Sequence, residues 1–132
     1  MNIFLDDYRN PPDCATYMYK RIGKLNPIYL EEVWFVVRNH PDFVKAIDRF
    51  KGNIETISFD HDLADGHYHQ NMQEGVINYD SADFQSDEYS KTGWHSAKYL
   101  KEVYAKERLP LPQIFVHSLN PVGTENIINL FK

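Results

Sequence analysis

Asp60, His61 and Asp62 are the residues whose types and spacing point most directly to chemistry. Two carboxylates flank an imidazole at the end of the short apolar run 57–59. Carboxylates bind hard divalent cations, and an imidazole transfers protons at neutral pH because its unperturbed pKa is about 6.5. Three titratable groups at the end of a buried strand are costly unless they have a task. The pattern therefore favours a functional site.

Two other apolar runs end in a similar way. Residues 3–5 lead into an acidic pair, and residues 114–116 lead into a histidine and a serine. Ligands of an open parallel sheet bind outside the carboxyl ends of its strands, so the three ends are predicted to share one site. The side chains that follow these two runs are Asp6, Asp7, His117 and Ser118.

The carboxylates at these ends suit Mg²⁺ or Mn²⁺, which prefer oxygen ligands. Gathered at one edge without a counter-charge they would repel one another, and a cation relieves that repulsion. The sequence therefore predicts a Mg²⁺ or Mn²⁺ site whose ligands are Asp6, Asp7, Asp60 and Asp62.

Each motif also has a purely structural interpretation. An acidic pair after a strand is often a turn or a helix cap. His117 taken alone is typical of a packed histidine bonded to the backbone, and residues 120–123 could form a plain turn before a helix. The motifs support one another only if the fold brings the strand ends together.

Four short runs rich in apolar and β-branched residues are predicted as strands. The run 32–38 is almost continuously apolar, which predicts a strand buried on both faces. Strands that alternate with helices imply a parallel sheet with right-handed crossovers, and hence an α/β fold. The predicted strands are 2–5, 32–38, 54–59 and 113–116.

Helices are predicted between these strands. The best periodic segment begins at Pro41 and ends at Gly52. A second helix opens at Gly93, and Thr124 is predicted to cap the last one. A weaker helix is expected over about residues 13–22, because the two prolines before it forbid an earlier helix interior.

The composition is that of one globular domain spanning residues 1–132. Of its residues 42% are hydrophobic and 14% aromatic, which suffices for an ordinary core. Cys14 is the single cysteine, so no internal disulfide forms. Met1 leads straight into a strand and no apolar stretch approaches about 18 residues, so we expect a cytoplasmic protein without a membrane span.

The net charge of −5 is concentrated in residues 64–92, which hold six acids and one base, against thirteen of each elsewhere. No basic stripe of the kind that grips a phosphate backbone is visible. The charge argues against a long duplex nucleic acid and leaves a small phosphate-containing ligand or a strand end as the expected partner. Residues 64–92 show little periodicity and are predicted to be an insertion or lid.

Several side chains of this insertion have alternative tasks. His67 and His69 could bind a metal, although exposed loop histidines are usually solvated. The aromatic residues could cover a base or a sugar by stacking, anchor the insertion to the body, or form a subunit contact. The sequence does not choose among these. The aromatic residues are Tyr68, Tyr79, Phe84 and Tyr89.

With the strands placed, the sequence resembles a response-regulator receiver domain, which carries an acidic pair after its first strand, an Asp after its third and a Ser or Thr after its fourth. Receivers hold Mg²⁺ with these acids and phosphorylate the Asp of the third strand. They also need a fifth strand ending in Lys, whereas only 14 residues follow Ser118 here. Arg9 could supply a positive charge, but phosphorelay is not expected. The matching positions are Asp6, Asp7, Asp60 and Ser118.

The sequence is more similar to a divergent branch, the cyclic-phosphate processing receiver-like family. The likeness covers nearly the whole chain apart from residues 64–91. It implies a receiver- or flavodoxin-like three-layer α/β sandwich, with a short parallel sheet in the order 2-1-3-4 and a long acidic insertion after the third strand. The motifs are F-L-D-D-x-R-x-P-P at 4–12, S-x-D-H-D-L at 58–63, T-G at 92–93 and V-H-S-x-N-P-x-G at 116–123.

The resemblance implies a metal-assisted phosphoesterase that opens a cyclic phosphate on a nucleotide or an RNA end. Such a reaction needs a base to activate water and an acid to protonate the leaving alcohol, and two imidazoles could divide these tasks. A guanidinium could clamp phosphate oxygens, while hydroxyl and amide groups donate to them. The predicted catalytic residues are His61, His117 and Asp60, and the predicted substrate-binding residues are Arg9, Ser118 and Asn120.

Two other classes of function stay open. The chain could be a non-catalytic module that binds or sequesters a phosphorylated or cyclic nucleotide ligand, or a receiver-like interaction domain controlled by a protein partner. A homo-oligomer is compatible with each of these. By analogy with the family, such a domain would suit a phage or a bacterial conflict system that handles cyclic signals.

Overall fold

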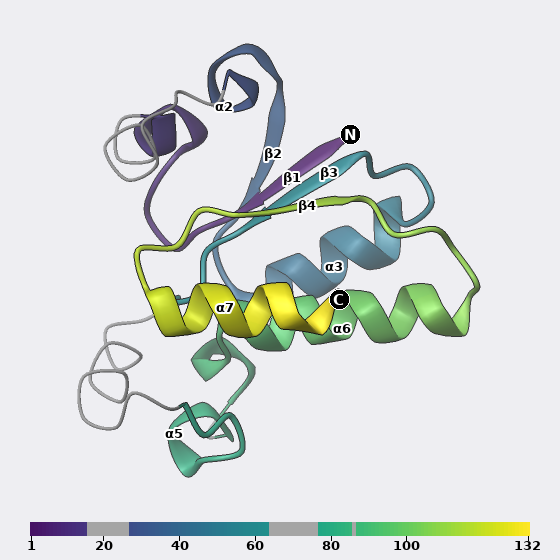
Figure 1. Ribbon diagram of the computed structural model, residues 1–132. Helices are drawn as coiled ribbons and strands as arrows, with labels where there is room; N and C mark the ends of the chain where they lie inside the picture. The colour runs from purple at the N-terminus through teal and green to yellow at the C-terminus, as the bar shows by residue number, and fades with distance from the viewer. Residues whose placement is uncertain (16–26, 64–76, 86) are drawn as a thin grey trace.

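Four strands form one parallel sheet in the order β2-β1-β3-β4 in the computed structural model, which describes residues 1–15, 27–63, 77–85 and 87–132 (Figure 1). This order and the parallel pairing confirm the predicted receiver-like sheet. Because the strands run in the same direction, the residues that follow them meet at one edge. The strands are β1 (Asn2–Leu5), β2 (Trp34–Val37), β3 (Thr56–Phe59) and β4 (Gln113–Val116).

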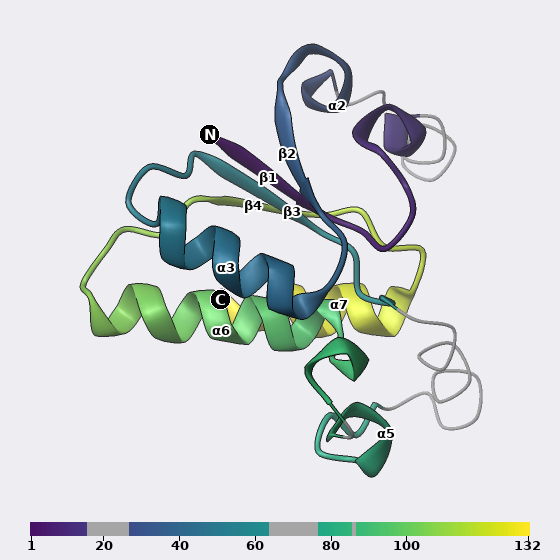
Figure 2. The ribbon, with the colours of Figure 1, turned by 180° about the vertical axis from the view of Figure 1, so that it is seen from behind.

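Helices α3, α6 and α7 cover one face of the sheet (Figures 1 and 2). Alternate side chains of each strand point into this layer, because successive residues of a strand face opposite sides. Ile3, Leu5, Ile57 and Phe59 are completely buried in it. The helices are α3 (His40–Phe50), α6 (Gly93–Lys106) and α7 (Pro121–Leu130).

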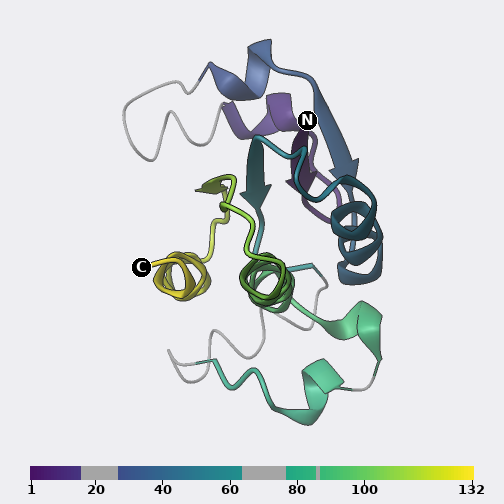
Figure 3. The ribbon, with the colours of Figure 1, turned by 90° about the vertical axis from the view of Figure 1, so that its right-hand side faces the viewer.

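The other face carries a smaller layer, made by α2 (Ile28–Glu31) and the helical residues 11–15 (Figure 3). Phe4, Cys14 and Tyr29 form its buried core. The rings of Phe4 and Tyr29 meet edge to face, with their centroids 6.2 Å apart. Helices therefore flank the sheet on both faces, as the three-layer prediction requires.

Two helices begin earlier than predicted. α7 begins at Pro121, and its N-cap is Asn120 rather than Thr124. The Asn120 Oδ1 accepts a hydrogen bond from the backbone N–H of Gly123 at 3.0 Å. The helical residues 11–15 likewise begin at a proline. Proline fits the first turn of a helix, where its missing N–H has no intrahelical bond to lose, so the predicted later starts were wrong.

β2 lies at an edge of the sheet, and its predicted burial on both faces was wrong. Among the described residues it pairs with β1 alone. Phe35 is 42% exposed, and Val33, just before the strand, is 88% exposed. A continuous apolar run predicts a strand, but it does not tell whether a second neighbour lies beside it.

α3 follows its prediction closely. The Asn39 side chain caps it by accepting a hydrogen bond from the backbone N–H of Asp42 at 2.8 Å. Phe43 and Ile47 are completely buried on its inner face. Gly52 ends it with a φ of 85°, a left-handed value that favours glycine.

The acidic insertion is described from residue 77 onward, apart from residue 86. It holds two short helices that were not predicted, α5 (Ala82–Gln85) and the 3₁₀ helix η1 (Glu88–Ser90). The Tyr79 ring stacks on the Trp94 ring of α6 at 4.1 Å, and Phe84 is buried. Tyr79 and Phe84 thus anchor this part of the insertion to the body.

His67, Tyr68 and His69 fall in residues 64–76, outside the described part of the chain, so their predicted tasks stay untested. Within the described part, no helix combines the length and the hydropathy needed to cross a bilayer.

Candidate functional site

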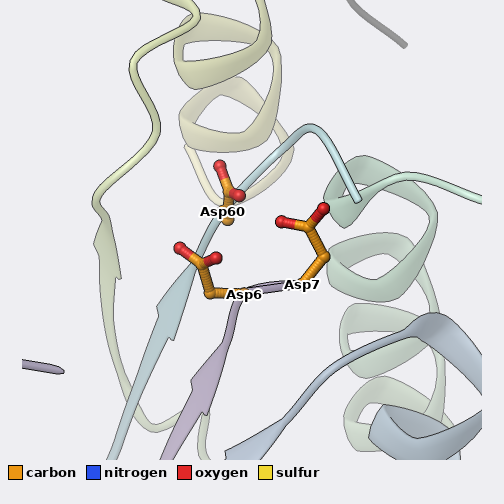
Figure 4. Close-up of side chains that lie close together, drawn as sticks. All are labelled: Asp6, Asp7 and Asp60. Atoms are coloured by element: carbon orange, nitrogen blue, oxygen red, sulfur yellow. The ribbon is translucent and has the colours of Figure 1, made fainter. Parts of the chain in front are cut away.

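Asp6, Asp7 and Asp60 meet at the carboxyl ends of β1 and β3, with one oxygen of each within 4.8 Å of the others (Figure 4). Asp6 and Asp60 are buried and Asp7 is half-buried. In the described part of the chain, Asp7 Oδ1 and Asp60 Oδ2 have no hydrogen-bond partner. Buried carboxylate oxygens without donors, gathered in one place, fit a hard divalent cation such as Mg²⁺ or Mn²⁺.

Asp6 is the most firmly held of the three. Its Oδ1 accepts hydrogen bonds from the backbone N–H groups of Tyr8 at 3.0 Å and Arg9 at 2.8 Å, and its Oδ2 lies 3.1 Å from His117 Nε2. Burial by itself would raise the pKa of Asp6, but these hydrogen bonds outweigh it and the pKa lies below its ordinary value. Asp6 is therefore an ionised, oriented carboxylate.

The pKa values of Asp60 and Asp7 are shifted in the opposite direction from that of Asp6. Burial, followed by the negative charge of Asp6, raises the pKa of Asp60 to about 8. The same two causes raise the pKa of Asp7 to about 6. Both carboxyls thus keep their protons to a higher pH than an ordinary Asp, Asp60 up to about pH 8 and Asp7 up to about pH 6, and a bound cation would displace these protons.

Asp62 lies outside this group of three carboxylates. Its Oδ1 lies 2.7 Å from His61 Nδ1, and the Asn120 side-chain amide donates to its two oxygens at 3.2 and 3.3 Å. Asp62 was predicted as a fourth metal ligand, but the structure does not bring it together with the other three. Its contacts instead connect the end of β3 to the start of α7.

His61 is completely buried between the starts of α6 and α7. Its Nε2 lies 2.9 Å from the Tyr79 hydroxyl, to which the Asn126 side chain donates at 2.9 Å. A Cβ added to Gly123 would lie 2.3 Å from the His61 ring. Only a glycine therefore allows the first turn of α7 to pack on this imidazole.

Gly93 plays the corresponding part for α6. Its N–H donates to the carbonyl of His61 at 2.8 Å, and an added Cβ would lie 1.7 Å from the carbonyl oxygen of Asp60. Thr92 caps the helix by accepting from the N–H of Trp94 at 3.2 Å. Sequence analysis placed Gly93 in a motif but missed this close approach.

His117 is also completely buried. Its ring stacks on Phe4, with the centroids 4.3 Å apart, and its Nδ1 lies 2.7 Å from Ser58 Oγ. Its Nε2 faces Asp6, as described above. Both rings predicted to transfer protons therefore contact protein side chains through both nitrogens.

The chain matches the family of cyclic-phosphate processing receiver domains over residues 1–132. It belongs to this family. Searches of curated proteins and of solved structures found no match.

Arg9 brings a positive charge to the acidic cluster of this receiver domain. Its guanidinium is buried, with Nη1 3.6 Å from Asp6 Oδ2 and 4.0 Å from Asp60 Oδ2. It also lies over the Tyr8 ring, 4.7 Å from the centroid. This places the predicted phosphate-binding arginine beside the predicted metal ligands.

Arg38 is a site residue that sequence analysis missed. It follows β2 at the same edge, and its guanidinium donates to the carbonyls of Asp6 at 3.3 Å and Arg9 at 2.5 Å, and to Asn10 Oδ1 at 2.6 Å. It thereby holds the loop that carries the acidic pair. Arg38 could have been predicted from its position directly after a strand that ends at this edge of the sheet.

Ser118 and Asn120, predicted to bind substrate, are buried at the end of β4. Ser118 Oγ accepts a hydrogen bond from the backbone N–H of Asn120 at 3.0 Å. The Asn120 side chain caps α7 and donates to Asp62. In this receiver domain both residues thus shape the loop between β4 and α7.

Proposed function

We propose that this receiver domain is a metal-assisted phosphoesterase that opens a cyclic phosphate at the carboxyl edge of its sheet. The observation that carries the proposal is the cluster of Asp6, Asp7 and Asp60 beside the guanidinium of Arg9, in which two buried oxygens accept no hydrogen bond from the described part of the chain. The family supplies the class of substrate. A 2′,3′-cyclic phosphate end or a cyclic nucleotide is the proposed ligand.

Asp6, Asp7 and Asp60 would hold Mg²⁺ or Mn²⁺. When bound, the cation neutralises a phosphate oxygen and makes phosphorus more electrophilic. Arg9 would hold a second phosphate oxygen, because a guanidinium pairs with phosphate through two parallel N–H groups. Water adds to phosphorus, one ester bond of the ring breaks, and the released alcohol takes up a proton, which leaves a linear phosphomonoester.

His61 and His117 are proposed to assist this proton transfer. Their present contacts point to an indirect route, because His117 faces Asp6 and His61 faces Asp62. His117 would then act on the reaction through Asp6, and His61 would act by holding the segment that follows β3 through Asp62 and Tyr79. Direct transfer would require substrate to reach rings that are completely buried.

The experiment is phosphorus NMR of the purified protein with 2′,3′-cyclic and 3′,5′-cyclic nucleotides, with Mg²⁺, with Mn²⁺ and with a chelator. We expect a linear phosphomonoester to form only with a divalent cation. Asp60→Asn and His61→Ala should abolish turnover. Glu55→Gln is the matched control, because it removes an exposed carboxylate at the opposite end of the same strand. Cyclic substrate that persists under all conditions would refute hydrolysis.

A non-catalytic binding module is the second candidate, and the complete burial of both imidazoles favours it. The protein would then bind a cyclic or phosphorylated nucleotide without changing it. A ligand that binds only the folded state raises the melting temperature. Melting temperatures that rise with a cyclic nucleotide whose phosphorus resonance stays unchanged would select this candidate.

A further inference from the structure

A chain of side-chain hydrogen bonds runs behind the acidic cluster, from the smaller helical layer to Asp6. The Tyr29 hydroxyl lies 2.7 Å from Ser58 Oγ, which lies 2.7 Å from His117 Nδ1. His117 Nε2 lies 3.1 Å from Asp6 Oδ2. None of the four residues is more than 2% exposed. They come from α2, β3 and the ends of β4 and β1, so the chain joins four segments of the fold.

The direction of these hydrogen bonds follows from the groups themselves. An ionised carboxylate only accepts, so His117 Nε2 must carry the hydrogen that faces Asp6. A neutral imidazole has one N–H, so its Nδ1 then accepts, and the donor is the Ser58 hydroxyl. The Ser58 oxygen is left to accept from the Tyr29 hydroxyl. The chain therefore donates in one direction, from Tyr29 to Asp6.

The surroundings of His117 also hold its ring in place. Its ring is completely buried and stacks on Phe4 at 4.3 Å with an angle of 5° between the ring planes. The ring is thus held at its face by Phe4 and at its two nitrogens by Ser58 and Asp6.

We propose that Tyr29 and Ser58 are positioning residues for the metal site: Tyr29 holds Ser58, Ser58 holds the His117 ring by donating to its Nδ1, and His117 thereby orients Asp6 as a ligand. This rests on the proposed function where it concerns the metal, because Asp6 is a ligand only if the cluster binds a cation. The hydrogen-bond chain itself is a property of the metal-free protein. Its two parts can therefore be tested separately.

Removing the Ser58 hydroxyl takes away the donor to Nδ1. Nδ1 is then buried without a donor, and the ring is held only by the contact of its Nε2 with Asp6 and by the stack on Phe4, so it orients the Asp6 carboxylate less firmly. Removing the Tyr29 hydroxyl is milder, because Ser58 can still donate. Metal affinity should therefore be lowest in Ser58→Ala, intermediate in Tyr29→Phe and highest in the wild type.

Thr56→Ala is the matched control. Thr56 is a buried hydroxyl residue of the same strand, two positions before Ser58 and hence on the same face. Its loss changes the packing of β3 without interrupting the chain to His117. Tyr29→Phe is the second variant in case Ser58→Ala does not fold, since it removes one oxygen and leaves the ring in place.

The first measurement is a long-range ¹H–¹⁵N spectrum of the histidine side chains in the chelator-treated protein. We expect His117 to carry its hydrogen on Nε2 in the wild type and in both variants. Its Nδ1 resonance should move toward that of a nitrogen that accepts no hydrogen bond in Ser58→Ala, but not in Thr56→Ala. The second is calorimetric titration with Mn²⁺. Partners that orient a ligand typically contribute 10- to 100-fold to metal affinity, so Ser58→Ala should bind Mn²⁺ roughly 10-fold more weakly.

The two measurements separate the possible failures. A His117 Nδ1 resonance and a Mn²⁺ affinity that are unchanged in Ser58→Ala and Tyr29→Phe would overturn the positioning role. Equal weakening in Thr56→Ala would overturn it too, because the effect would then be one of packing. A wild-type protein that shows the expected tautomer but binds no Mn²⁺ would instead overturn the metal part of the proposed function, and with it the effect of Ser58 on metal affinity.

Discussion

The three clustered carboxylates differ in what already holds them. Asp6 accepts hydrogen bonds from two backbone N–H groups and faces His117. Asp60 Oδ2 and Asp7 Oδ1 have no such partner among the described residues. Asp6 is thus a fixed anion, whereas the other two gain from either a proton or a cation. At the scale of single residues, this difference makes Asp60 the most informative position to change.

Asp60→Asn should have opposite effects on the metal-free and the cation-loaded protein. Without a cation the substitution removes a buried carboxyl that is costly to ionise beside Asp6, so the free energy of unfolding at pH 8 should rise, by up to about 1.4 kcal/mol for each unit by which the fold raises the pKa of Asp60. With Mg²⁺ or Mn²⁺ it removes a ligand, so the rise in melting temperature on adding the cation should disappear. Thermal melts with a chelator and with saturating cation measure both effects.

The control for this pair of melts is again Glu55→Gln. It should change neither the metal-free stability at pH 8 beyond a few tenths of a kcal/mol nor the response to cation, because surface substitutions rarely exceed about 0.5 kcal/mol. An Asp60→Asn protein that keeps the full cation response would show that the cation binds elsewhere.

At the scale of elements, two helix starts close on the end of β3. The first turn of α7 packs on the His61 ring at Gly123, and the first residue of α6 packs on the Asp60 carbonyl at Gly93. Both helices thereby fix the segment that follows β3. The glycines matter here for the space they leave, since neither has a positive φ.

Gly123→Ala should therefore disturb the site as well as the fold. The added methyl would lie 2.3 Å from the His61 ring, and overpacking of this kind typically costs about 1–3 kcal/mol. Gly52→Ala is the contrasting control, because its Cβ would meet nothing within 4 Å and its cost comes from the positive φ alone. Both should lower the melting temperature, but only Gly123→Ala should shift the His61 side-chain resonances. A Gly52→Ala protein with the same shift would contradict this account.

The strands and helices also show how much of the fold could be predicted from the sequence. The four strands were predictable from apolar runs. Their alternation with helices predicted a parallel sheet at whose edge Asp6, Asp7 and Asp60 meet, and the receiver resemblance implied the strand order. The start of α7 was not predictable locally, because Asn120 followed by a proline and Thr124 are both good caps. The contact between Asn120 and Asp62 is a tertiary one that no local pattern contains.

The placement of the Asp62 side chain outside the group of three carboxylates could not be predicted from the sequence either. The chain leaves the strand after Phe59, so the alternation of strand side chains no longer says which way a residue points. A sequence motif also does not predict whether its histidine is exposed or buried. His117 was expected at the site, and it is there, but stacked on Phe4 and facing Asp6.

At the scale of the whole molecule, the fold gathers negative charge at one edge of the sheet and balances it only in part. Arg9 approaches the cluster, yet its distances to Asp6 and Asp60 are 3.6 and 4.0 Å, longer than direct hydrogen bonds. The raised pKa of Asp60 expresses the remaining imbalance. Metal-free stability should therefore depend on pH in a way that a cation removes.

The sign follows from which state binds more protons. The folded-state pKa of Asp60 is raised to about 8, whereas an unfolded Asp titrates at about 3.9, so between these values the folded protein holds a proton that the unfolded chain has lost. Stability must then fall as pH rises through this window, by up to about 1.4 kcal/mol per pH unit. Asp7, with its pKa raised to about 6, adds to the fall at lower pH.

Asp60 should govern the pH dependence of stability between pH 6.5 and 8. His95, whose pKa burial lowers to about 4, works in the opposite direction, but only below about pH 6.5, where an unfolded histidine takes up its proton. Urea unfolding of the chelator-treated protein between pH 6.5 and 8 should thus show stability decreasing with pH. The slope should flatten in Asp60→Asn and in the wild type with saturating Mg²⁺, because in both the folded state no longer retains the Asp60 proton. A metal-free wild type whose stability rises over this interval would mean that Asp60 is ionised in the folded protein, and that the cluster does not need a cation to carry its charge.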